Sequence, residues 1–130
     1  MSYIDIEGIV GPSAVMPGVE MDLEEAIRMT ETRFPDRSFC IVDEWVWLDL
    51  DAPDLVVQEL AMEGKKPVML LMLNVVFDSY TKTSSALWLR SSPLIDFSDG
   101  MFFQTQNKLY VLLSHGRRKT MPLSAVLRVF

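Results

Sequence analysis

The hydrophobic and polar positions of the chain are organised around one apolar stretch, residues 67–77. Asn74 is the only polar residue between Val68 and Phe77. As a strand this stretch would extend over roughly 33 Å, enough to cross a small domain, whereas as a helix of roughly 15 Å it would reach only halfway through a bilayer. Apolar residues at both alternating positions indicate a strand with both faces covered. We therefore expect a central buried strand in which the Asn74 amide is hydrogen-bonded or placed at a bulge or sheet margin.

Three segments of the chain are predicted to be helices: residues 22–34, 53–63 and 122–130. The first has Asp22 as an N-cap and ends before Pro35. The second has an expected cap at Asp51 and a stop signal at Gly64, after the apolar residues Leu55, Val56, Leu60 and Met62. The third follows Pro122 and repeats apolar residues at helical spacing, so it should pack on the sheet.

A long strand is predicted at residues 39–50. Asp43 and Glu44 interrupt its apolar pattern, and four large residues share one parity: Phe39, Ile41, Trp45 and Trp47. Together with the helix at 53–63 and the strand at 67–77, this strand is expected to form a crossover unit, right-handed if the two strands are parallel.

The second half of the chain changes to short strands and turns. Strands are expected at 86–90, 94–97, 101–106 and 109–113, with Asn107 in a tight hairpin turn. Residues 114–120 are predicted to be a turn, and residues 1–21 an arm and loop because glycine and proline recur there. The predicted fold class is α+β, a single domain of residues 1–130 with a mostly antiparallel sheet of about five to six strands.

Composition and charge narrow the functional classes. The single cysteine, Cys40, cannot form an internal disulfide, and the first residues lack the pattern of a secretion signal, so we expect a cytoplasmic protein without a membrane span. The net charge of −6 is unevenly divided: residues 1–65 hold 15 acidic and 4 basic side chains, and residues 66–130 hold 3 and 8. The halves either neutralise each other within the fold or offer faces of opposite sign to different partners.

Catalytic and metal chemistry have few candidates in this sequence. A nucleophile would require Cys40 or a serine beside His115, the only histidine, and Cys40 lies in an apolar segment where a quiet, buried thiol is expected. One histidine and one cysteine cannot complete a structural zinc site, and the carboxylates after Asp49 lack calcium-loop spacing. We therefore predict no catalytic residue, no metal and no cofactor.

A basic segment precedes the last helix. Backbone N–H groups at a glycine turn and the planar forks of arginine suit an anion, so the candidate anion-binding residues are His115, Arg117, Arg118 and Lys119. The alternative is that these cations pair with the acidic half of the chain. Duplex nucleic acid is disfavoured as a partner, because no aromatic residues interleave with the cations and the overall charge repels phosphate.

Tryptophans provide a second set of candidates. Trp45 and Trp47 share one side of a strand, which suits either a core wall or, if they are exposed, an aromatic contact surface, and Trp88 is a third candidate. Acidic residues border the same strand. The candidate partner-binding residues are therefore Asp43, Glu44, Trp45, Trp47, Asp49 and Asp51.

Three segments of the C-terminal third resemble a small uncharacterised family from pseudomonads and their prophages: WLRSSPL at 88–94, FQTQNKLYVLL at 103–113 and GRRKT at 116–120. The acidic N-terminal half lies outside this resemblance. The family brings no assigned activity or catalytic residues. The resemblance implies a cytoplasmic accessory protein that is phage-borne.

Two functional hypotheses follow. The first is a non-catalytic protein-interaction module, acting as a phage-borne or prophage-borne inhibitor of a host protein through its acidic N-terminal half or its tryptophan strand. The alternative is a small-anion binder or enzyme centred on the basic segment from His115 to Lys119. A pocket in which Cys40, His115 and a carboxylate converge would favour the alternative. The sequence leaves the oligomeric state open.

Overall fold

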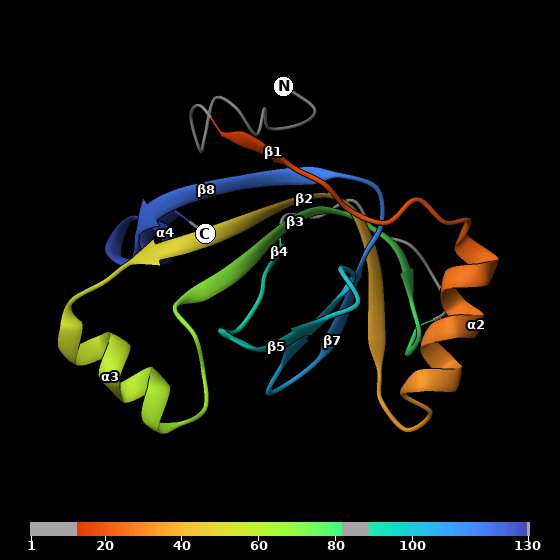
Figure 1. Cartoon of the computed structure of the whole chain (residues 1–130), viewed down its shortest axis with the longest axis horizontal. Helices are drawn as coiled ribbons and strands as arrows, with labels where there is room; N and C mark the ends of the chain where they lie inside the picture. Colours follow the sequence, from red (N-terminus) through yellow and green to blue (C-terminus); the bar gives the residue numbers. More distant parts are fainter. Residues whose placement is uncertain (1–12, 82–88, 130) are drawn as a thin grey trace.

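The computed structural model describes residues 13–81 and 89–129, which form a curled sheet of eight strands and three helices (Figure 1). The strands are β1 (Ala14–Met16), β2 (Phe39–Asp51), β3 (Val68–Asp78), β4 (Leu89–Arg90), β5 (Leu94–Ser98), β6 (Phe102–Thr105), β7 (Leu109–Leu112) and β8 (Gly116–Pro122). The helices are α2 (Leu23–Arg33), α3 (Asp54–Met62) and α4 (Leu123–Val129). The mixed α+β class is confirmed, with more strands than the sequence predicts.

Strand β2 organises the sheet. It pairs antiparallel with β3 on one side, and on the other side its first half runs parallel to β7 and its second half parallel to β8. The strand order is therefore β1-β8-β2-β7-β6-β5, with β3 and β4 beyond the other edge of β2. Antiparallel pairs outnumber parallel ones, as predicted.

The predicted crossover unit is wrong, because β2 and β3 are antiparallel. Helix α3 connects their neighbouring ends and does not cross the sheet. Apolar residues at both parities of β3 did predict that both faces are covered, and Leu70 and Leu71 are indeed fully buried in different apolar clusters. Coverage of both faces does not fix strand direction, since the curl of this sheet encloses one face and helices cover the other.

Strand β2 turns its side chains over at Glu44, whose φ of 51° is unusual for a residue with a side chain. As a result, Trp45 and Trp47 lie on the opposite face from Phe39 and Ile41, although all four share one parity in the sequence. Beside this kink, the Asn74 amide donates a hydrogen bond to Asp43 Oδ1 at 2.7 Å. The prediction that the Asn74 amide is hydrogen-bonded is confirmed.

Three apolar clusters stabilise this arrangement. The inner cluster lies within the curl of the sheet and consists of Cys40, Val42, Trp45, Trp47, Leu70, Met72, Val75, Leu94, Phe103 and Leu112. The α2 cluster lies between the sheet and α2 and consists of Ala26, Phe39, Ile41, Met101, Phe102, Leu109, Val111 and Leu113. The α4 cluster consists of Val46, Leu48, Leu50, Met69, Leu71 and Val126. No residue of α3 belongs to any of them.

The helix ends follow local rules in one case and depart from them in another. Asp22 caps α2, accepting a hydrogen bond from the Glu25 backbone N–H at 2.8 Å, as predicted. The expected cap at Asp51 is wrong: Asp51 ends β2, and Pro53 occupies the N-cap of α3 without a side-chain hydrogen bond. Gly64, at φ 74°, follows the end of α3, where a residue without Cβ is favoured.

Other segments also differ from their predictions. Residues 114–120 are not a single turn, because β8 begins at Gly116 and runs into α4. Part of the N-terminal arm is a strand, β1. The alternation of apolar and acidic residues at 3–7 predicts a further short edge strand, which lies outside the described residues. Positive φ occurs at Asp99, between the paired strands β5 and β6, and at Ser114, between β7 and β8, and not at Asn107. Within residues 13–81 and 89–129, no helix is both long enough and apolar enough to cross a membrane.

Candidate functional site

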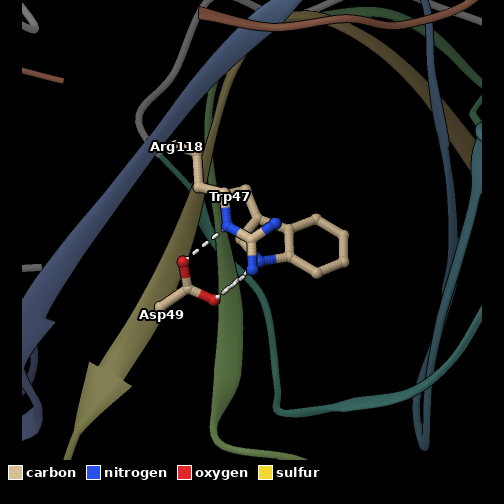
Figure 2. Close-up of polar contacts among 3 residues, drawn as sticks. All are labelled: Trp47, Asp49 and Arg118. Atoms are coloured by element: carbon tan, nitrogen blue, oxygen red, sulfur yellow. Dashed lines mark hydrogen bonds and ion pairs between the residues drawn. The ribbon is translucent and has the colours of Figure 1, made fainter. Parts of the chain in front are cut away.

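The Arg118 side chain forms a polar cluster with Asp49 and Trp47 on the described surface. Its Nε donates to Asp49 Oδ2 at 2.7 Å and its Nη2 donates to Asp49 Oδ1 at 3.0 Å. Its guanidinium carbon also lies 5.5 Å from the centre of the Trp47 ring. Figure 2 shows the guanidinium over the indole, with both carboxylate oxygens turned toward it. We name Trp47, Asp49 and Arg118 the Arg118 platform.

The sheet register explains why these three residues meet. In the parallel pair of β2 and β8, Trp47 lies opposite Arg118. Asp49 is two residues beyond Trp47 and therefore lies on the same face of β2. Trp47 Nε1 donates to Asp49 Oδ1 at 3.1 Å, so the carboxylate is held from two sides. Stacking and a two-pronged ion pair together restrict the guanidinium to one orientation.

The Arg118 platform is half open to solvent. The Trp47 residue is 7% exposed, whereas the side chains of Asp49 and Arg118 are 31% and 51% exposed. Hydrogen bonding to Asp49 raises the pKa of Arg118, so the guanidinium remains charged. Within the described part of the chain, Nη1 has no hydrogen-bond partner, and it is free to donate to another molecule. The opposite charges of Asp49 and Arg118 offset each other, which lowers the free-energy cost of removing the pair from water when a partner covers it.

The candidate anion-binding residues do not form one site. Arg117 and Lys119 lie opposite Val46 and Leu48, on the face covered by α4, because side chains alternate along β8. Arg118 therefore points to the other face. His115 lies beyond β7 with its side chain 68% exposed, and its Nδ1 is 3.9 Å from Glu20 Oε1. Arg117 Nη1 donates to the Ser13 hydroxyl at 3.4 Å.

The candidate partner-binding residues are also divided. Trp45 is 1% exposed and donates through Nε1 to the Leu113 carbonyl at 3.0 Å, so it is a core residue. Asp43 and Glu44 lie at the kink of β2, and Asp51 is exposed at its end. Trp88 lies outside the described residues. Trp45 and Trp47 are both buried, so they do not form the exposed aromatic contact surface that the sequence suggested as one alternative.

Cys40 is buried in the inner cluster, as predicted. Burial raises the pKa of its thiol to about 11, and Lys108 only partly offsets this effect. Its neighbour across the parallel pair is Tyr110, whose pKa is raised by burial to about 12. His115 does not approach Cys40, since it lies beyond the far end of β7. The structure therefore does not bring these two residues together as a nucleophile and base.

We expect Cys40 to resist thiol reagents. At pH 7, a pKa of about 11 leaves roughly one thiolate in ten thousand molecules. Native protein should react with Ellman's reagent at least about a hundredfold more slowly than urea-unfolded protein, and the native rate should rise with pH until the thiol ionises. Equal rates in the native and unfolded states at pH 7 would show that the thiol is accessible.

Two features of the surface were missed in the sequence. The pairing of Asp49 with Arg118 was missed because 69 residues separate them and strand pairing alone brings them together. The exposure of Leu55 and Met62 was also missed, although their spacing of seven residues places them on one side of a helix. Among the described residues, no group of three or more histidine, cysteine and acidic side chains is arranged to hold a metal ion.

A family model described as a domain of unknown function (DUF6957) matches residues 17–128, and the chain belongs to this family. The match covers most of the chain, so it extends well beyond the C-terminal segments that carry the resemblance noted above, and it does not bear on an origin in pseudomonads or prophages. It includes the Arg118 platform, α2, α3 and all of α4 except its last residue. No curated protein and no solved structure matches the chain significantly.

Proposed function

We propose that this protein is a non-catalytic protein-interaction module and that the Arg118 platform is a contact surface for its partner. The observation that carries the proposal is an exposed arginine whose orientation is fixed by Trp47 and Asp49. Arginine and tryptophan dominate the binding energy of many protein interfaces, and a side chain that is already ordered loses little entropy on binding. The acidic half contributes Asp49 and the basic half contributes Arg118.

The chemistry of the platform favours an aromatic side chain of the partner. One face of the guanidinium lies on Trp47, and the other face can accept a second ring. The free Nη1 can donate to a backbone carbonyl of the partner. A carboxylate or phosphate is less suited, because Asp49 already occupies the two-pronged edge of the guanidinium and would repel a second anion.

Inhibition of the bound protein is the finer part of the proposal. It rests on the resemblance of the C-terminal segments to a family from pseudomonads and their prophages. The alternative of an anion binder or enzyme centred on the basic segment has less support, since the cations of that segment point to both faces of β8.

Affinity capture from host lysate tests the proposed function. The Arg118→Lys variant keeps the positive charge but loses the planar, two-pronged contact, so it should lose a partner that the unmodified protein retains. Arg33→Lys is the matched control, because Arg33 also pairs with an aspartate, Asp99, and also lies over aromatic rings. Equal capture by the unmodified protein and Arg118→Lys would contradict a role for the platform.

Small probes distinguish aromatic from anionic ligands at the same site. N-acetyltryptophanamide should shift the NMR signals of Arg118 Nε–H and Trp47 Nε1–H, whereas sodium acetate at the same ionic strength should leave them unchanged. The Arg118→Lys protein should show no response at Trp47. Shifts caused by acetate alone would support the anion-binding alternative, and an equal aromatic response at Arg33 would show non-specific association.

A further inference from the structure

Helix α3 is separate from the rest of the packed structure. It lies beyond the ends of β2 and β3, away from the centre of the sheet (Figure 1). None of its residues is buried, whereas both α2 and α4 bury residues against the sheet. Helix α3 therefore connects two strands without adding a fully buried residue to the core of the described fold.

The apolar residues of α3 divide between two sides of the helix. Val56, Val57 and Leu60 are half-buried. On the other side, Leu55 is 67% and Met62 is 87% exposed. These two residues are seven positions apart, so they lie within roughly 20° of each other around the helix axis and roughly 10 Å apart along it. They form an apolar stripe that nothing in the described residues covers.

Acidic side chains border this stripe. Asp54, Glu59 and Glu63 are all exposed, and Glu59 lies on the same side of the helix as Leu55 and Met62. Glu63 pairs with Lys65 at 3.3 Å. Neither Asp54 nor Glu59 forms an ion pair with any residue in 13–81 or 89–129. The exposed side of α3 is therefore an apolar stripe with a largely unneutralised negative border.

We infer that the exposed side of α3 is a docking surface for a basic amphipathic helix of a partner protein. The apolar face of such a helix would cover Leu55 and Met62, and lysine or arginine side chains on its borders would meet Asp54 and Glu59. This surface is distinct from the Arg118 platform. Its acidic residues, Asp54 and Glu59, belong to α3, whereas the acidic residue of the platform, Asp49, belongs to β2.

The negative charge on the exposed side of α3 disfavours two other occupants, a second copy of the chain and an anionic lipid surface. In a two-fold symmetric contact between copies, each residue near the axis meets its own equivalent, so Glu59 would be placed near a second Glu59. An anionic lipid surface would be repelled by the same carboxylates. A basic partner is the occupant that both the apolar stripe and its border favour.

Binding of designed amphipathic peptides to the full chain tests this inference. The two peptides share length and a leucine stripe, and one carries lysine and the other glutamate at the polar positions. The lysine peptide should bind, shift the NMR signals of α3, and bind more weakly as salt is added, whereas the glutamate peptide should not bind. Leu55→Ser combined with Met62→Ser should weaken the lysine peptide at least about tenfold.

Two controls make the test specific. Leu127→Ser removes another exposed leucine, on α4, and should leave peptide affinity unchanged. Replacing both Asp54 and Glu59 by lysine should exchange the preference between the two peptides, which gives a second readout if the serine variant is poorly folded. Arg118→Lys should not change peptide affinity, so failure at one surface is distinguishable from failure at the other.

Several results would overturn the inference. These are equal binding of the two peptides, no binding of the lysine peptide, or affinity that survives both α3 variants. Co-sedimentation with vesicles of phosphatidylcholine and phosphatidylglycerol that requires Leu55 and Met62 would assign the surface to lipid. A dimer in gel filtration that the serine variant converts to a monomer would assign it to a second copy of the chain.

Discussion

Gly116→Ala is expected to lower the free energy of unfolding by about 3 kcal/mol, because the added methyl group has no space. A Cβ at this position would lie 2.5 Å from Trp45 Cε3 and 2.5 Å from the Trp45 carbonyl oxygen. Trp45 cannot move away without disturbing the inner cluster, in which it is 1% exposed. Urea unfolding followed by circular dichroism measures the change.

Gly64→Ala is the matched control for this substitution. No atom lies within 4 Å of a Cβ at Gly64, so only its positive φ of 74° opposes the change. That strain should cost about 1 kcal/mol. If Gly116→Ala is no more destabilising than Gly64→Ala, the close packing of β8 on Trp45 is not important for stability.

The elements that the sequence predicted well are those specified by neighbouring residues. Asp22 and Pro35 bound α2 through a cap and a breaker, and both act within one helical turn. The apolar run of β3 required burial wherever it was placed, so it was correctly assigned to the core. The turn at Asp99 and Gly100, where both residues have positive φ, follows from the same local chemistry.

The pairing of β2 could not be predicted from local pattern. Its direction relative to β3 and its change of neighbour from β7 to β8 depend on how the whole sheet curls. The interruption at Asp43 and Glu44 was visible, but alternation alone does not show that the side chains change face there. Glutamate is also not a residue type that is enriched at positive φ, so the sequence does not indicate the φ of 51° at Glu44.

The candidate site was predicted in part. Trp47, Asp49 and Arg118 were all selected in the sequence, but the first two were assigned to one site and the third to another. The register of two parallel strands unites them, and alternation along β8 separates Arg118 from Arg117. The run of cations at 117–119 therefore says less about the site than Asp49 does, because strand pairing places this carboxylate beside Arg118.

Removal of the Trp45 indole should have the largest effect on stability, with Trp45→Ala lowering the free energy of unfolding by about 4 kcal/mol. The ring contributes to the inner cluster and lies against Gly116. Its Nε1 also donates to the Leu113 carbonyl at 3.0 Å, so truncation leaves a backbone acceptor without its partner. Trp45→Phe retains most of the apolar contact and should lower the free energy by about 2 kcal/mol.

A double-mutant cycle connects this prediction to the first one. If the Trp45 ring is the main obstacle to a methyl group at position 116, Gly116→Ala should cost less than half as much in the Trp45→Ala protein as in the unmodified protein. Trp45→Phe provides the same comparison if Trp45→Ala does not fold. Additive losses in urea unfolding would show that Gly116 is required for its backbone and not for its contact with the indole, and a loss of under about 1 kcal/mol for Trp45→Ala would contradict its burial.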